Sequence, residues 1–186
     1  MPNATFARPP PSGSRPSSRQ LAGRAGFSLL ELMVVVAIIA ILALIALPSI
    51  SEKLVRDRIV ESIKLADIVK APLAASWAAS GTLPVDNAAA GLPVADEIVN
   101  DYISAVAVES GAIQITFGNQ ANAAVRGKML SLRPGVVEDA KVVPISWVCG
   151  DADPPGKMTA RGLNKTSVAA RYLPLQCRAR AAGAAP

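Results

Sequence analysis

The sequence contains no histidine and only two cysteines among its 186 residues. The absence of histidine removes the commonest general base and the commonest zinc ligand, and two thiolates cannot complete a four-cysteine metal site. Catalytic triads that need histidine are therefore excluded, and the sequence also has no phosphate-binding loop of the kind that nucleotide-hydrolysing enzymes use. We expect a protein that is not an enzyme and that uses no metal or cofactor.

Acidic residues are missing from residues 1–26, which hold four arginines and are rich in proline, serine and glycine. This stretch has no helical or strand periodicity, so we expect a disordered basic leader. The other 15 lysines and arginines nearly balance the 14 acidic residues that follow. The net charge of +5 therefore says little about the body of the protein.

Polar side chains are almost absent from residues 27–47, where only Ser28 and Glu31 interrupt the apolar run. A helix of this length would be about 31 Å long, which matches a hydrocarbon core of about 30 Å. Because the arginines precede the run, the positive-inside rule places the leader in the cytoplasm and the residues after Pro48 outside it. A carboxylate inside a plain membrane anchor would cost about 2 to 3 kcal/mol unless it lay near the interface or found a partner.

The order of Gly26, Phe27, Glu31 and Pro48 around the unbroken apolar residues 32–47 resembles the N-terminus of type IV pilins and related pseudopilins. The resemblance implies that a prepilin peptidase cuts between Gly26 and Phe27 on the cytoplasmic side. It also implies that the new N-terminal residue, Phe27, is N-methylated. On the same grounds Glu31 serves in assembly, and Pro48 ends the first helical stretch.

Glu31 has a specific physical role on this interpretation. Cleavage would create a cationic amine on Phe27 inside a filament core of packed apolar helices, where Glu31 of a neighbouring subunit would neutralise it. A subunit in the wrong register would leave both charges unpaired in a medium of low dielectric constant. The alternative is a plain anchor in which Glu31 reaches the membrane edge.

A second helical pattern fills residues 49–80. Apolar residues recur three or four positions apart, at Val55, Ile59, Ile63, Ala66, Val69, Leu73 and Trp77. This spacing predicts an amphipathic continuation of the helix with one buried stripe, and Glu52 and Arg56 on the charged face are placed as an i, i+4 pair. Because proline removes a backbone hydrogen bond, we expect local kinks or loosening at Pro48 and Pro72.

Turn residues and short strand patterns make up residues 81–186. We expect the helix to end at Gly81 and a loop to follow as far as Pro93. Strands are predicted at residues 102–108, 112–117, 128–133 and 143–148, with a hairpin link at residues 109–111. A four-stranded antiparallel sheet on the helical stripe gives an α+β protein. This agrees with the fold that the resemblance implies, the pilin fold, in which a long N-terminal α-helix with a transmembrane first half packs on the sheet.

The two cysteines, Cys149 and Cys177, are expected outside the cytoplasm, where a disulfide is the simplest prediction and two separate buried thiols are the alternative. The bond would close a loop over residues 149–177 and contribute roughly 3 kcal/mol. The segments "ISWVCG" and "ARYLPLQCR" around them are similar to segments of type IVa pilins. Two nearby acids, Asp151 and Asp153, fall short of a calcium ligand set, so we expect a solvated loop there.

Charges are segregated along the second half of the chain. Residues 81–125 contain five acids and no lysine or arginine, whereas residues 149–186 contain six bases and two acids. The acidic segment of one subunit could face the basic segment of another, or both could be ordinary solvated surface. Binding of DNA phosphates by the basic segment is a weaker alternative, because only Tyr172 accompanies these bases.

These features and the resemblance together predict a structural subunit of a type IV pilus that is polymerised into a surface filament. The resemblance implies that this filament serves adhesion, twitching motility and DNA uptake. The expected parts are a cleaved leader (1–26), a transmembrane and assembly helix (27–48), an amphipathic continuation (49–80) and a globular head (81–186). The expected partners are other pilin subunits, the prepilin peptidase, an inner-membrane assembly platform, and a host surface or DNA.

Before assembly we expect the chain in the inner membrane with its N-terminus cytoplasmic and its head periplasmic, and afterwards in the extracellular pilus. A minor pilin or a type II secretion pseudopilin is the near alternative. A membrane-anchored periplasmic enzyme or binding protein is the distant one, since a pair of carboxylates could still act without histidine.

Overall fold

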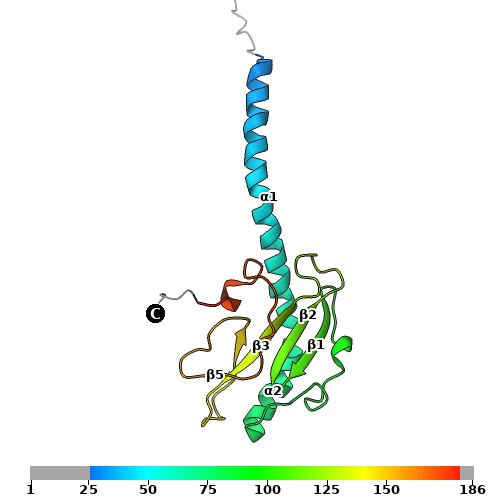
Figure 1. Cartoon of the computed structure of the whole chain (residues 1–186), viewed down its shortest axis with the longest axis vertical. Coiled ribbons are helices and arrows are strands. Elements are labelled where there is room, and N and C mark those ends of the chain that lie inside the picture. Colours follow the sequence, from blue (N-terminus) through cyan, green and yellow to red (C-terminus); the bar gives the residue numbers. More distant parts are fainter. Residues whose placement is uncertain (1–25, 181–186) are drawn as a thin grey trace, which may run out of the picture. The chain divides into compact units, whose positions relative to one another are not determined.

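The computed structural model describes residues 26–180, apart from the side chains of residues 46–49. The described chain divides into two compact units between Leu42 and Ala43. Helix α1 (Leu29–Leu65) contributes its first part to one unit and its second part to the other (Figure 1). The predicted leader lies outside the described residues except for Gly26.

The helical part of the second unit carries the predicted apolar stripe. Helix α2 (Asp67–Ser80) follows α1, and every stripe residue is buried except Ile63, which is half-buried. The helix ends as predicted at Gly81, which adopts a left-handed conformation (φ 74°) and donates its backbone N–H to the Trp77 carbonyl at 2.8 Å. Glycine is favoured there because it has no Cβ to oppose a positive φ.

The expected end of the first helical stretch is wrong. The backbone of α1 stays helical through Pro48, so the first helical stretch does not end there. Proline removes one hydrogen bond, and the helix formers on both sides maintain the remaining ones. The helix is interrupted instead at Ala66, whose N–H bonds to Ile63 three residues back, while Pro72 lies inside α2.

The predicted i, i+4 pair between Glu52 and Arg56 is also absent from the ion pairs of residues 26–180. Arg56 instead donates a hydrogen bond of 2.8 Å to the backbone carbonyl of Arg171. An exposed pair on a helix stabilises by only about 0.3 to 0.5 kcal/mol, so a tertiary contact readily replaces it.

The head contains an antiparallel sheet in the order β1-β2-β3-β4, with β5 paired to β3 (Figure 1). The strands are β1 (Ile103–Glu109), β2 (Ala112–Phe117), β3 (Met129–Val136), β4 (Ser146–Cys149) and β5 (Thr159–Ala160). The four-stranded prediction is confirmed for β1 to β4. The fourth strand begins three residues later than predicted, because Pro144 lacks a backbone N–H and a turn precedes it. The two-residue strand β5 is too short for sequence alternation to reveal it.

Alternating side chains of the sheet form the core against the helical stripe. The largest of them are fully or almost fully buried: Val106, Val108, Ile113, Ile115, Phe117, Leu130 and Leu132. The predicted hairpin link joins β1 to β2 through Ser110 (φ 48°) and Gly111 (φ 83°). Positive φ at both turn residues matches the right-handed twist of the paired strands.

The other face of the sheet is covered by a chain segment that a buried polar network holds. Ser131 donates to the Gln114 side-chain oxygen at 2.6 Å, and the Gln114 amide donates to the Leu163 carbonyl at 2.9 Å. The backbone N–H of Lys165 donates to the Ser131 hydroxyl at 2.7 Å. Gln114 and Ser131 are both buried, and these bonds offset the cost of removing them from water.

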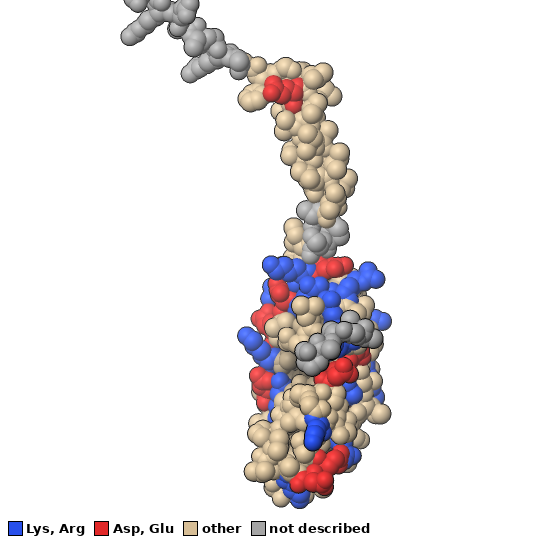
Figure 2. Space-filling model, turned by 90° about the vertical axis from the view of Figure 1, so that its left-hand side faces the viewer, with Lys and Arg blue, Asp and Glu red and all other residues tan. Residues whose placement is uncertain are grey.

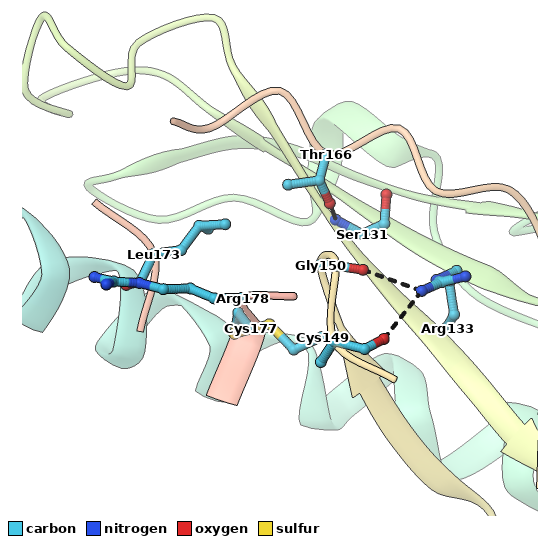
Figure 3. Close-up of a disulfide and its surroundings, with 9 residues drawn as sticks. Ser131, Arg133, Cys149, Gly150, Thr166, Leu173, Cys177 and Arg178 are labelled. Atoms are coloured by element: carbon cyan, nitrogen blue, oxygen red, sulfur yellow. Dashed lines mark hydrogen bonds between the residues drawn. A yellow bond between two sulfur atoms is a disulfide. The ribbon is translucent and has the colours of Figure 1, made fainter. Parts of the chain in front are cut away.

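The predicted disulfide joins Cys149, the last residue of β4, to Cys177 in the short helix η2 (Leu175–Cys177). Figure 3 shows the bond beside Arg133, which donates to the carbonyls of Gly150 and Ala152 at 3.1 and 3.4 Å. Both sulfur-bearing side chains are buried, and they join the C-terminal segment to the sheet.

Removing the disulfide by the double change Cys149→Ser and Cys177→Ser is expected to lower the free energy of unfolding of the head by about 3 to 4 kcal/mol, because the unfolded chain regains the entropy of a 28-residue loop. Guanidinium unfolding of the detergent-solubilised chain, followed by tryptophan fluorescence, measures this change. Reduction of the unmodified chain should reproduce it, and an unchanged midpoint would contradict it.

We expect that the C-terminal segment can pack in its observed position only with glycine at position 150, whereas position 156 does not require glycine for this packing. Both have a positive φ, 57° and 56°, but a Cβ on Gly150 would lie 2.6 Å from the Cys177 carbonyl oxygen, and one on Gly156 would meet nothing within 4 Å. Gly150→Ala should therefore destabilise the head by about 1 to 2 kcal/mol more than Gly156→Ala. Because the left-handed strain is common to both, equal unfolding midpoints would disprove the contact.

Candidate functional site

The candidate site begins with the three residues before helix α1. Gly26 and Phe27 are exposed, and Phe27 keeps 84% of its surface accessible. The backbone of residues 26–28 is not helical. A Cβ on Gly26 would meet nothing within 4 Å, so the fold of this chain does not require glycine there. The Gly26–Phe27 peptide bond thus lies outside the helix and is open to another protein.

Ser28 caps the start of helix α1. Its hydroxyl accepts a hydrogen bond of 3.2 Å from the backbone N–H of Glu31, and its carbonyl accepts one of 3.1 Å from the N–H of Leu32. Serine followed three residues later by glutamate is the sequence signature of a capping box, and this signal was missed in the sequence analysis. The carboxylate of Glu31 also lies in the first turn, where it interacts favourably with the positive end of the helix dipole.

Glu31 carries a charge in an otherwise uncharged part of the chain. On the face drawn in Figure 2, the first part of α1 has acidic atoms only near its beginning. Among residues 26–180, the Glu31 carboxylate forms no ion pair. A cation that neutralises it would therefore come from outside the side chains of these residues.

The large apolar side chains from Leu29 to Ile45 are all exposed. Helix α1 is long and apolar enough to cross a membrane by length and composition, and the most apolar part of it has no buried residue. An apolar surface of this extent is unfavourable in water, so it requires lipid or other apolar helices around it. Pro48 lies in the helical backbone beyond this segment, within the second unit.

The acidic loop after β4 has no feature of a metal site in the part of the chain that the structure describes. No group of three or more acidic, cysteine or histidine residues could hold a metal ion there. Asp151 instead accepts a hydrogen bond of 2.7 Å from the Asn164 side chain.

Comparisons with known proteins agree with both ends of the described chain. A family model described as the prokaryotic N-terminal methylation motif matches residues 21–47, and one described as pilin, a bacterial filament protein, matches residues 55–178.

Several relatives align over most of the chain. A type IV major pilin protein, PilE1, from Neisseria gonorrhoeae is 34% identical over 160 residues, which cover 82% of this chain and 86% of the relative. The fimbrial protein EcpC of Eikenella corrodens is 35% identical over 156 residues, 82% and 90% of the two chains. A fimbrial protein of Neisseria meningitidis serogroup B is 31% identical over 162 residues, 82% and 93% of the two chains. Because the pilin model matches more than half of the chain and these relatives cover most of it, the chain belongs to the pilin family of bacterial filament proteins.

Proposed function

We propose that this chain is a type IV prepilin, which is processed and polymerised into a surface pilus that serves adhesion, twitching motility and DNA uptake. The observation that carries the proposal is the exposed apolar part of α1, which directly follows an accessible Gly26–Phe27 bond within the N-terminal methylation motif. Relatives named as type IV major pilin and fimbrial proteins support the same assignment. The force for motility would come from cytoplasmic ATPases acting through an inner-membrane assembly platform.

Processing follows from the state of the N-terminal residues. The prepilin peptidase would cut between Gly26 and Phe27 on the cytoplasmic side, since a protease needs non-helical, accessible backbone. Both conditions hold for residues 26–28. Cleavage removes the basic leader and leaves a cationic amine on Phe27, which is then N-methylated. The head would lie in the periplasm before assembly, where its disulfide can form.

Assembly would move the first part of α1 from lipid into a bundle of identical helices. Both surroundings are apolar, so the transfer changes the burial of its side chains little. The amine of Phe27 and the carboxylate of Glu31 are the polar exceptions. Pairing them between neighbouring subunits would offset their desolvation, whereas losing one partner of a buried pair costs about 3 to 5 kcal/mol.

The proposal is tested directly on cells that naturally carry this chain. Fibres sheared from the surface, imaged by electron microscopy and analysed by mass spectrometry, are expected to consist mainly of a chain that begins at N-methylated Phe27. A trace amount of the mature chain in such fibres would indicate a minor pilin. A chain found only in membranes with residues 1–26 attached would contradict the proposal.

Two substitutions separate the charge of Glu31 from its place in the capping box. Glu31→Gln retains a capping side chain but loses the charge, and Glu31→Ala loses both. If the charge pairs with the amine of Phe27, both variants should be inserted and cleaved normally but should yield at least about tenfold fewer filaments, because one buried charge is left unpaired.

The matched control is Ser28→Ala, which removes the cap at a cost of about 1 kcal/mol and leaves the charge. This variant should assemble. Cleavage is followed by mass spectrometry and filament yield by electron microscopy of sheared fractions. Normal yield from Glu31→Gln with poor yield from Ser28→Ala would mean that Glu31 acts only through helix capping.

A further inference from the structure

Two arginines from distant parts of the chain meet at one backbone carbonyl. Arg56 of α1 donates to the Arg171 carbonyl at 2.8 Å, and Arg178 donates to the same oxygen at 3.4 Å. Arg178 also donates to the Leu173 carbonyl at 2.9 Å. With the exposed side chain of Arg171, three guanidinium-bearing residues lie together, and we call them the arginine cluster.

The arginine cluster has no negative partner in the described part of the chain. Within residues 26–180, none of its members forms an ion pair, and the buried Nε of Arg56 has no hydrogen-bond partner. Backbone carbonyls accept only a few of the N–H groups that three guanidinium groups carry. The forked geometry of these groups matches carboxylate oxygens. The cluster can therefore bind an anion, and no residue within 26–180 supplies one through an ion pair.

Suitable carboxylates lie on another edge of the same head. The short helix η1 (Ala95–Glu97) exposes Asp96 and Glu97, flanked by the exposed apolar residues Val94 and Val99. Neither carboxylate has an ion-pair or hydrogen-bond partner among the described residues, and residues 81–125 contain no lysine or arginine. We call these four residues the η1 patch.

Some charges of residues 81–125 and 149–186 are already paired inside the head. Glu109 pairs with Lys165, and Glu138 pairs with Arg161. These pairs remove one of the five acids of residues 81–125 and two of the six bases of residues 149–186 from the charges available for contacts between subunits. The arginine cluster and the η1 patch are complementary in charge, and neither forms an ion pair within residues 26–180.

The two surfaces lie on opposite edges of the sheet. Helix η1 contacts β1 and η2 contacts β4, and these strands are the two ends of the order β1-β2-β3-β4. Figure 1 shows the segment before β1 and the C-terminal segment on opposite sides of the head, and Figure 2 faces the C-terminal side. A symmetric dimer would need both surfaces on one face, whereas a head-to-tail contact uses opposite edges and can repeat without closing.

We propose that the arginine cluster of one subunit binds the η1 patch of a second copy of this chain, with Asp96 or Glu97 as the carboxylate. This inference rests on the proposed polymerisation and names the head surfaces that meet in it. Each exposed charge pair contributes little by itself, but complementary charges discriminate strongly between correct and incorrect partners.

Charge reversal tests the contact in cells that assemble filaments from the full chain. Arg171→Glu changes an exposed side chain and leaves the carbonyl that holds Arg56 and Arg178 in place. This variant, and separately Asp96→Arg with Glu97→Arg, should each reduce filament yield about tenfold, because like charges then face each other. The combined triple variant should recover most of the yield. Lys128→Glu, an equal change of an exposed base outside both surfaces, should leave the yield unchanged.

Cysteine cross-linking tests the head-to-tail geometry. The chain with both Arg171→Cys and Asp96→Cys, oxidised mildly as filaments, should give a ladder of covalent multimers on a non-reducing gel, whereas each single variant should give monomers. Mass spectrometry should find the native disulfide between Cys149 and Cys177 retained. Filaments that give no ladder would overturn the proposal.

The outcomes separate this inference from the proposed function. If the unmodified chain forms no filaments, the proposed function fails. If filaments form and the charge variants assemble at normal yield, the proposed function holds and the inference is wrong. Arg171→Glu filaments that assemble normally but no longer bind a duplex oligonucleotide would also overturn the inference. The arginine cluster would then bind DNA phosphates and not a second subunit.

Discussion

The two parts of helix α1 require different surroundings. Its first part is apolar on every side, whereas from Val55 onward only one stripe is apolar and the rest carries charges. A helix that is apolar all round is stable only in lipid or among other apolar helices. A helix with one stripe needs a single covering surface, which the sheet provides. The change between these patterns determines which part of the chain folds by itself and which part depends on other molecules.

Three separate features of the head cover its sheet and its core. The helical stripe covers one face of the sheet, and the network of Gln114 and Ser131 holds a segment over the other face. The disulfide then joins the C-terminal segment to β4. A head closed on both faces exposes few large apolar side chains beyond scattered ones, so its remaining recognition surfaces depend on charge.

The sequence was most informative where one regular spacing of apolar residues, or one turn residue, determines the local structure. The stripe and the helix end at Gly81 follow from the 3.6-residue period and one backbone conformation, and β1 to β3 follow from strand patterns and turn residues. Contacts between distant residues were not predictable in this way. Arg56 was expected to pair with Glu52 but bonds to a carbonyl 115 residues away. The buried bond between Gln114 and Ser131 likewise requires knowing that β2 lies beside β3. At the N-terminus, the cap formed by Ser28 was a local signal, and sequence analysis could have found it.

Apolar packing alone cannot determine how such subunits align. The hydrophobic effect depends on the area removed from water and has little directional preference, so two apolar helices can slide past each other at modest cost. A charge on an apolar surface changes this, because a shift of one turn leaves it without a partner in a medium that solvates it poorly. Glu31 is therefore informative because it is unfavourable in most arrangements. The same reasoning applies to the arginine cluster. Backbone carbonyls hold the guanidinium groups of Arg56 and Arg178 beside Arg171, and these like charges are stabilised in the arrangements that bring a carboxylate to them.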